Sequence, residues 1–299
     1  MAEGSYSPEQ QRLLTIMQGM RYPIEERTQA GIDLAEIGDP RPGVEVGEDG
    51  VPDIVWCEIP GKDEGSSPCM IGGDDDAYQS LPVTIVDLPT FAISKYPITY
   101  AQFQPFVEEK GFANDQWWQK EDEHWSYTQG FKVWNHPREC VTWYAAMAYC
   151  KWLSATVGYE VRLPTEEEWE KAARGEAGRL YPWGNTFING YANLNETYND
   201  GIHFLDRTSA VGIYPPESAS PYAVMDMAGN VWEWTLSAFE SSDKAQEGKA
   251  GHPLHHISRR VLRGGSWLDG AQRVRGASRL DESPADWSRF IGLRVVRPL

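Results

Sequence analysis

The chain has 299 residues, a length that allows one large domain or two small ones. Its 41% apolar residues can form a sizeable core, which argues against a disordered chain. A formal charge of −17 argues against nucleic acid as a partner. The sequence contains neither a run of about 18 apolar residues nor a basic segment followed by an apolar one. We therefore expect no membrane partner and a cytoplasmic location.

The residues of the N-terminal segment predict helices. Apolar residues at helical spacing predict two short helices, at 8–17 and 24–37, and the glycines and prolines of 38–43 end the second. Residues 1–53 then form a helical lead-in and linker, and residues 54–299 form the main domain. We expect the helices to pack onto this domain, with an assembly surface as the alternative.

The next segments predict strands. Residues 54–60 alternate enough to form a first strand, and 81–88 and the stretch from Phe91 onward look like two paired strands. Residues 61–76 between them are rich in Gly, Ser and Asp and predict a loop. Its three adjacent aspartates, Asp74 to Asp76, favour a solvated turn over a cation site.

Three further helices are predicted by their capping residues. Capping boxes begin at Thr99 and Thr165, and Thr142 caps a helix between them. The helix dipole explains the acidic residues that follow Thr165. Glycines end the three helices at Gly111, Gly158 and Gly175. After Gly175 the sequence predicts loops with a few short strands.

Two compositional features accompany these elements. Aromatic rings crowd residues 116–134, where they either line a pocket or fill the floor of the domain. Arginines outnumber acids from Arg259 to the end of the chain, whereas acids are concentrated upstream. We expect these arginines to pair with acids elsewhere in the fold rather than to form an anion site.

Several motifs occur in a fixed order along the main domain. Gly229-Asn-Val-Trp-Glu-Trp234, Arg260-Val-Leu-Arg-Gly-Gly-Ser-Trp267 and Ile291-Gly-Leu-Arg-Val-Val-Arg297 close the chain, after motifs at 141–150 and 162–170. Together they resemble the formylglycine-generating (sulfatase-modifying) enzyme family. The resemblance covers roughly residues 54–299. It implies an α+β fold of the C-type-lectin type with little regular secondary structure, preceded here by the short helical segment.

The cysteines depart from the family pattern. In formylglycine-generating enzymes two cysteines after the Gly-Gly-Ser-aromatic motif bind copper(I) and support oxidation of a substrate cysteine. Here Asp269 stands at the first position, and no cysteine follows Cys150. Because a carboxylate does not replace a thiolate for copper(I), we expect no copper and no catalytic residues of that kind. A valine, Val295 or Val296, stands where a family partner of Cys150 would be, so Cys150 is expected to be a lone core thiol.

The resemblance also implies structural calcium. The family builds two calcium sites on motifs that this chain carries in part, and carboxylates, amides and main-chain carbonyls are the oxygen ligands that calcium needs. Asp206 competes with Asp200 for the first site, and an arginine could hold Glu233 in place of a metal at the second. The corresponding residues are Asn193, Leu194 and Asp200 for the first site, and Asp226, Gly229, Val231 and Glu233 for the second.

Other catalytic relatives match less well. Sulfoxide synthases and selenium-transferring relatives join this domain to a four-helix domain with a three-histidine iron site, whereas the predicted N-terminal helices carry no histidine. His252, His255 and His256 share a loop with Pro253, which favours an exposed trio over a metal site. Ser266 has no partnering histidine within sequence reach.

Without the cysteines, the chain most resembles the variable proteins of diversity-generating retroelements. In those proteins the segment between the Gly-Gly-Ser-Trp motif and the closing motif holds the diversified ligand-contacting positions. As the alternative for Trp287 and Phe290, both rings pack beneath the loop. The corresponding positions of this chain are Leu268, Asp269, Gln272, Arg273, Ser278, Leu280, Asp281, Glu282, Asp286, Trp287, Ser288, Arg289 and Phe290.

We therefore expect a non-catalytic protein that binds a protein or other macromolecule through this C-terminal surface. Two alternatives stay open. One is an oxidoreductase or accessory enzyme of the same fold that uses other groups, such as Asp269, Ser266, Arg279 or a bound metal. The other is a signalling or effector module whose N-terminal helices dock into a larger assembly.

Overall fold

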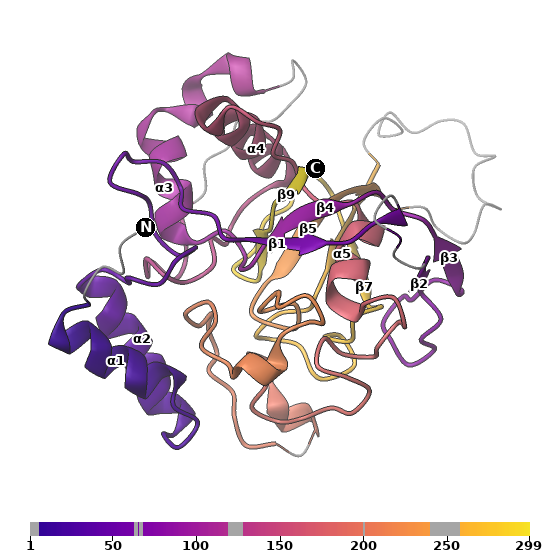
Figure 1. The fold of residues 1–299 in the computed structure, drawn as a ribbon, viewed down its shortest axis with the longest axis horizontal. Helices are drawn as coiled ribbons and strands as arrows, with labels where there is room; N and C mark the ends of the chain where they lie inside the picture. The colour runs from indigo at the N-terminus through magenta and orange to yellow at the C-terminus, as the bar shows by residue number, and fades with distance from the viewer. Residues whose placement is uncertain (1–5, 63–64, 66–67, 119–127, 200, 240–257) are drawn as a thin grey trace.

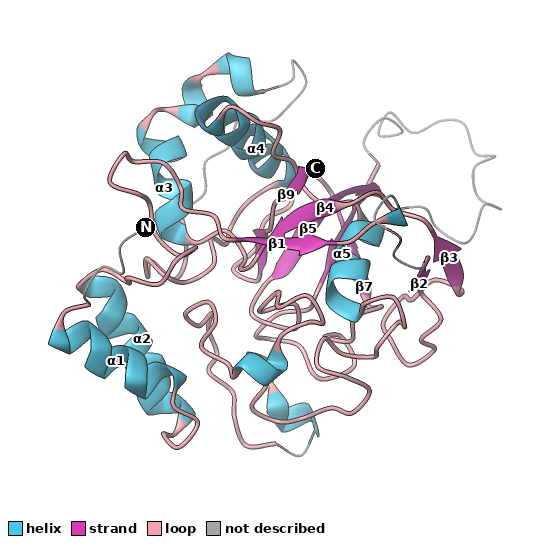
Figure 2. Cartoon of the chain, in the orientation of Figure 1, coloured by secondary structure: helices cyan, strands magenta, loops and turns pink. Residues whose placement is uncertain are grey.

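The computed structural model describes residues 6–62, 65, 68–118, 128–199, 201–239 and 258–299. Two N-terminal helices, α1 (Pro8–Gln18) and α2 (Ile24–Glu36), form a hairpin at one side of a larger body (Figure 1). Loops and turns make up much of that body (Figure 2). Helices and small sheets together confirm the expected α+β class.

Two small antiparallel sheets are built from the first four strands and the last one. In the first sheet β4 lies between β1 and β9, and the second sheet consists of β2 and β3. The strands are β1 (Trp56–Ile59), β2 (Cys69–Ile71), β3 (Thr84–Val86), β4 (Phe91–Ser94) and β9 (Val296–Pro298).

The third sheet has four strands in the order β7-β6-β5-β8. Its strands are β5 (Trp232–Ala238), β6 (Arg260–Arg263), β7 (Arg279–Glu282) and β8 (Ile291–Leu293). The β5–β8 pairing is parallel and the other two are antiparallel. The three closing motifs of the sequence therefore meet in this sheet.

Two strand predictions were wrong. Strand β2 lies within the predicted loop 61–76, because the buried side chains of Cys69 and Ile71 are surrounded in sequence by Gly, Ser and Asp, which mask the strand pattern. The predicted pairing of 81–88 with the stretch from Phe91 does not form. β3 pairs with β2, and β4 pairs with β1 and β9.

The three capped helices are confirmed. They are α3 (Tyr100–Glu108), α4 (Trp143–Val157) and α5 (Glu166–Arg174). Capping boxes at Thr99 and Thr165 are both complete. Gly158 ends α4 in the left-handed conformation, with φ of 77°. Short 3-10 helices also occur, namely η2 (Gly111–Ala113), η3 (Asp115–Trp117), η4 (Glu196–Asn199) and η5 (Pro216–Ser218).

The main core lies between α3, α4 and the third sheet, and aromatic rings dominate it. The Phe103 ring stacks on Tyr149, with centroids 4.7 Å apart. Trp118 is buried in the same core and donates its indole N–H to the Gly111 carbonyl at 2.9 Å. Trp134 instead stacks on Tyr100 and is 43% exposed. Within the segment 116–134, Trp117 and Trp118 thus pack in the core, whereas Trp134 lines an open pocket beside α3. Residues 119–127 lie outside the described part.

The N-terminal helices pack onto the main body, as expected. Buried residues of both helices form one apolar cluster with a loop of that body: Leu13, Leu14, Met17, Ile24, Ala30 and Leu34 meet Ala210, Ile213 and Tyr214. Arg27 of α2 donates to the main-chain carbonyls of Met17 and Ile213. Asn135 donates its side-chain amide to the Gly31 carbonyl at 2.9 Å.

Buried ion pairs join the C-terminal arginines to upstream acids, which confirms the expected pairing. The pairs are Arg294–Glu233, Arg263–Glu170, Arg279–Glu166 and Arg275–Asp74. Two expectations change as a result. Asp75 and Asp76 lie exposed in a turn, as predicted, but Asp74 is buried and accepts two hydrogen bonds from Arg275. Glu166 binds Arg279, a role beyond the helix dipole.

The Arg294–Glu233 pair gives a first prediction. Arg294→Met leaves the Glu233 carboxylate buried without its cation, which should lower the free energy of unfolding by about 3–5 kcal/mol. Urea unfolding followed by tryptophan fluorescence measures it. The matched control is Arg12→Met, because the Arg12–Glu9 pair is more than half exposed. A loss no larger than the control's would contradict a structural role for the buried pair.

A buried histidine predicts a pH dependence. His136 is fully buried, and its Nδ1 lies 2.9 Å from the Thr208 hydroxyl oxygen. Burial, helped by the nearby charge of Arg207, lowers the pKa of His136 to about 3. In the unfolded chain the histidine pKa is near 6.5, so the unfolded chain binds a proton at this residue below pH 6.5. The folded chain does not bind that proton until the pH approaches 3.

The stability contributed by neutral His136 is thus present above pH 6.5 and lost as pH falls toward 3. We expect a loss of up to about 1.4 kcal/mol per pH unit in that window. Unfolding curves at several pH values should show a shallower loss for His136→Gln than for the parent protein. Equal slopes would show that His136 is not the group responsible.

Candidate functional site

The turn that follows β6 is the centre of the candidate site. Gly264 and Gly265 both adopt left-handed backbone, with φ of 100° and 74°. A Cβ at Gly265 would lie 2.6 Å from the Val274 side chain, so only glycine fits there. The two glycines reverse the chain and present residues 267–273 at the surface.

Asp269 ties this turn to the third sheet. Its Oδ2 accepts hydrogen bonds from the Ser266 amide at 3.0 Å, the Ser266 hydroxyl at 2.6 Å and the Trp232 indole N–H at 2.9 Å. Its main-chain carbonyl accepts from the Asn195 amide at 2.9 Å. Asp269, for which the family resemblance predicts the position of a copper ligand, therefore acts as a structural clamp.

An open hollow of about 460 Å³ lies beside Asp269. Residues 268–273 form one wall, and Tyr198 and Asn199 form the other. The Asn199 side chain accepts from the Ala271 amide at 2.8 Å, which holds the two walls together. The Arg273 guanidinium lies 4.0 Å from the centre of the Tyr78 ring, a cation–π contact that fixes the arginine at the rim.

Two large apolar side chains that line the hollow are exposed, Tyr198 at 68% and Leu268 at 42%. Ile202, which follows Tyr198 closely in the chain, is 84% exposed. Phe204 stacks on Trp267 of the turn. We name the hollow together with Tyr198, Phe204 and Leu268 the 268–273 face. Adjacent exposed apolar side chains of this kind mark interaction surfaces.

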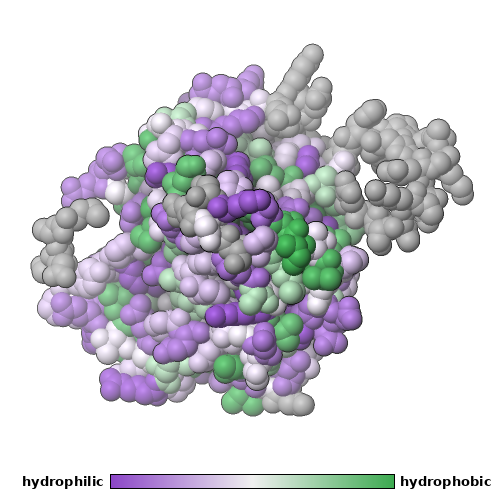
Figure 3. Space-filling view, turned by 45° about the vertical axis from the view of Figure 1, so that its right-hand side comes forward, coloured by the Kyte–Doolittle hydropathy of each residue, from purple (hydrophilic) through white to green (hydrophobic). Residues whose placement is uncertain are grey.

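Apolar side chains are also exposed elsewhere. On the side drawn in Figure 3, hydrophilic side chains predominate, with one cluster of hydrophobic residues right of the centre and smaller groups elsewhere. Ile85 of β3 and Val83, which directly precedes that strand, are also exposed, at 61% and 57%. Among the described residues, no helix combines the length and the apolar character that a membrane span requires.

The thirteen positions predicted to contact a ligand fall into separate groups. Leu268, Asp269, Gln272 and Arg273 share the hollow. Asp286, Trp287 and Arg289 are exposed, and the Arg289 carbonyl accepts from the Trp267 indole at 3.1 Å, so this loop borders the turn. Ser288 is half-buried in the same loop.

The remaining positions are engaged elsewhere. Asp281 and Glu282 pair with Arg259 at the far end of β6 and β7. Ser278 is fully buried and donates its hydroxyl to the Gln272 carbonyl. Leu280 and Phe290 pack against the main core, whereas Trp287 is 44% exposed. Packing beneath the loop therefore describes Phe290 but not Trp287.

The residues of the implied second calcium site surround a buried ion pair. Arg294 binds both carboxylate oxygens of Glu233, at 2.9 and 3.0 Å, and the Trp169 indole donates to Oε2 at 2.6 Å. The Asp226 carboxylate accepts from the Gly212 amide at 2.7 Å, and burial raises the pKa of Asp226 to about 6. Gly229 and Val231 flank this pair as buried main chain.

For the implied first site, the structure places Asn193 beside Gly229 in an isolated bridge, and the Asn193 carbonyl accepts from the Asn230 amide. Leu194 is buried, and Asp200 lies outside the described residues. Within the described part of the chain, no three His, Cys, Asp or Glu side chains gather in a metal-holding arrangement. The Glu233 position does not fit a calcium ion, because a dication there would lie beside the buried Arg294 guanidinium.

Calcium removal tests this arrangement. Because Arg294 already neutralises Glu233, chelation with EDTA and re-addition of calcium chloride should shift the thermal midpoint by less than about 2 °C. Differential scanning calorimetry on protein dialysed against each buffer gives the comparison. A calcium-dependent rise of the thermal midpoint well beyond that value would support a calcium site and contradict the view that Arg294 alone neutralises Glu233.

The described cysteines are not activated for chemistry. All four are free thiols. Cys140 donates to the Glu139 carboxylate, and burial raises the pKa of Cys140 to about 12. Burial also raises the pKa of Cys150, as expected of a lone core thiol. Reactive thiols require the thiolate form, which these environments oppose. Ser266 donates to Asp269, and the predicted trio His252, His255 and His256 lies outside the described residues.

The motifs, the sheet they build and the clamped turn define the class of the chain. Residues 62–299 match the sulfatase-modifying factor enzyme 1-like domain, and the chain belongs to this family. It is 31% identical over 263 residues to inactive Cα-formylglycine-generating enzyme 2 of Bos taurus, covering 72% of this chain and 79% of that protein. It is 30% identical to hercynine oxygenase of Mycobacterium tuberculosis, covering 79% of this chain but 58% of that protein.

Solved structures show the same fold. Treponema denticola variable protein 1 superposes with a TM-score of 0.61 at 22% identity, covering 82% of this chain and 95% of that one. PvdO of Pseudomonas aeruginosa superposes with a TM-score of 0.63 at 24% identity, covering 87% and 99%. The expected family and its C-type-lectin-type fold are thus confirmed.

Proposed function

We propose that this chain is a non-catalytic member of the family that binds a protein partner through the 268–273 face. The observation that carries the proposal is Asp269. Its Oδ2 accepts three hydrogen bonds at the position where the family places a copper-binding cysteine. A hard carboxylate held in this way stabilises the turn and offers no soft ligand to copper(I).

The surface around Asp269 has the composition of a protein interface. Tyr198, Phe204 and Leu268 supply an apolar centre, and Gln272 and Arg273 supply a polar rim. Trp287 and Arg289 extend it along the neighbouring loop, and aromatic and arginine side chains are the ones that most often dominate binding energy.

The face is also preorganised. The Asp269 clamp, the Asn199–Ala271 hydrogen bond and the Arg273–Tyr78 contact hold its two walls before any partner arrives. A rigid surface loses little conformational entropy on binding. Diversification of the exposed positions, as in retroelement variable proteins, belongs to this proposal because it would alter the rim without disturbing the clamp.

The competing proposal is an enzyme of the same fold, supported by the hercynine oxygenase relatives. The two proposals differ in what Asp269 does. If the face is a reaction site, the chain should bind copper or oxidise a cysteine-containing peptide. If it is a binding face, both properties should be absent while partner binding depends on the exposed apolar side chains.

Substitution at Leu268 tests the proposal. Leu268→Glu places a charge in the apolar centre and should abolish co-purification of a specific partner from the native host, with at least a tenfold loss of affinity once that partner is isolated. Ile85→Glu is the matched control, because Ile85 is similarly exposed but lies on β3. Equal partner recovery by both variants, or copper-dependent oxidation of a cysteine peptide by the parent protein, would contradict a non-catalytic binding face.

A further inference from the structure

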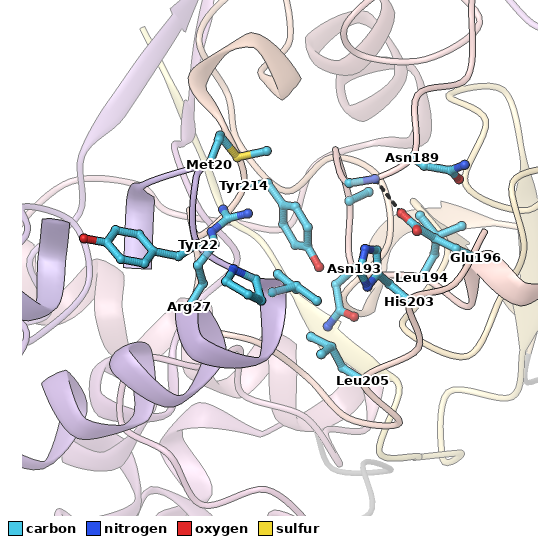
Figure 4. Close-up of a pocket in the computed structure, with 14 residues that line it drawn as sticks. Met20, Tyr22, Arg27, Asn189, Asn193, Leu194, Glu196, His203, Leu205 and Tyr214 are labelled. Carbon is cyan, nitrogen blue, oxygen red and sulfur yellow. Dashed lines mark hydrogen bonds between the residues drawn. The ribbon is translucent and has the colours of Figure 1, made fainter. Parts of the chain in front are cut away.

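A second cavity lies where the N-terminal helices meet the main body. Its volume is about 270 Å³, and it is lined by the start of α2 and by the loop from Asn189 to Leu205 (Figure 4). Tyr214, on the segment against which α2 packs, forms part of the same wall. We name it the α2 pocket. It shares no lining residue with the hollow of the 268–273 face.

Glu196 gives this pocket an unsatisfied negative charge. The residue is only 2% exposed, and its Oε1 accepts a hydrogen bond from the Gly190 amide. Its Oε2 is buried and has no hydrogen-bond partner among the described residues. An unpaired buried carboxylate oxygen is costly, and the cost falls when a donor or a cation reaches it.

The nearest internal cation is used elsewhere. Arg27 lines the pocket, but it donates its Nε to the Met17 carbonyl and its Nη2 to the Ile213 carbonyl. Its guanidinium lies 6.0 Å from the centre of the Tyr214 ring. No ion pair of Glu196 with a lysine or arginine occurs in the part of the chain that the structure describes. Among the described residues, the Glu196 carboxylate therefore has no lysine or arginine to neutralise it.

The other residues that line the pocket indicate which kind of cation would fit it. Figure 4 shows the Glu196 carboxylate, the His203 ring and the Tyr214 hydroxyl facing the same hollow. Leu194 and Leu205 supply apolar wall, with Met20 and Ile24 from the helix side. The volume far exceeds the ~30 Å³ that one water molecule occupies. One carboxylate among apolar side chains is a poor site for calcium, which takes six or more oxygens.

We propose that the α2 pocket binds a small alkylammonium compound. Its ammonium group donates to Glu196 Oε2 and to the Tyr214 hydroxyl, while its hydrocarbon part packs against Leu194 and Leu205. Because α2 and the main body both line the pocket, the bound amine also strengthens the contact between them, and it raises stability by mass action.

Titration with defined amines tests the proposal. The probes are n-pentylamine and 1,5-diaminopentane, with 1-pentanol as the uncharged analogue and calcium chloride as the rival cation. Isothermal titration calorimetry on the full chain should show binding of an amine and none of 1-pentanol. Glu196→Gln keeps an acceptor for the Gly190 amide and removes the charge, so amine affinity should fall by about tenfold or more.

Two variants complete the design. Glu217→Gln, at an exposed position of η5, is the matched control and should bind the amines as the parent does. Leu205→Trp fills the cavity from its apolar wall and should also abolish binding, which keeps the test decisive if Glu196→Gln folds poorly by circular dichroism. The proposal is overturned by absent amine binding, by equal binding to Glu196→Gln, or by Glu196-dependent calcium binding that excludes the amine.

Discussion

The buried pair of Arg294 and Glu233 is the interaction on which the rest of the body depends. Both side chains are almost fully buried, and Arg294 also donates to the carbonyls of Ser94 and Met225. One guanidinium thereby joins β5, the end of β4, and the loop that carries Met225, and the Trp169 indole adds α5 through Glu233. Removing either partner would leave a buried charge without its counter-ion, so we expect the packing of these elements to depend on the pair.

The 268–273 face is connected to this ion pair through strand β5. Trp232 precedes Glu233 in β5 and donates its indole N–H to Asp269. The candidate binding surface is therefore attached directly to the strand that holds the central ion pair. The hydrogen bonds of Asp269 hold the turn through protein groups alone, which is consistent with the proposed binding role of the exposed surface beside it.

Local signals in the sequence predicted the helices well, because capping by Thr99, Thr142 and Thr165 involves residues only three positions apart. Contacts between residues far apart in the sequence were harder to predict. The arginines were expected to find acids, but the Arg275–Asp74 contact spans 201 positions and could not be assigned in advance. Likewise, nothing local indicates that β4 pairs with β9 rather than with β3.

The candidate site was predicted in part for the same reason. Leu268, Asp269, Gln272 and Arg273 follow a motif and are contiguous in the chain, so the family pattern located them. Tyr198 and Ile202 come from a polar stretch without a motif, and only the fold brings Tyr198 to the hollow. The α2 pocket has no sequence signal, because its two sides, the start of α2 and the segment with Leu194, Glu196 and Leu205, lie far apart in the chain.

Photo-cross-linking from the face tests the central claim most directly. A photoreactive phenylalanine analogue placed at Leu268, and separately at Ile85, would be activated in the native host and the adducts identified by mass spectrometry. The account predicts one recurrent protein adduct from position 268 and no matching adduct from position 85. Absence of a specific adduct at 268, or the same adducts at both positions, would contradict a dedicated binding face around Asp269.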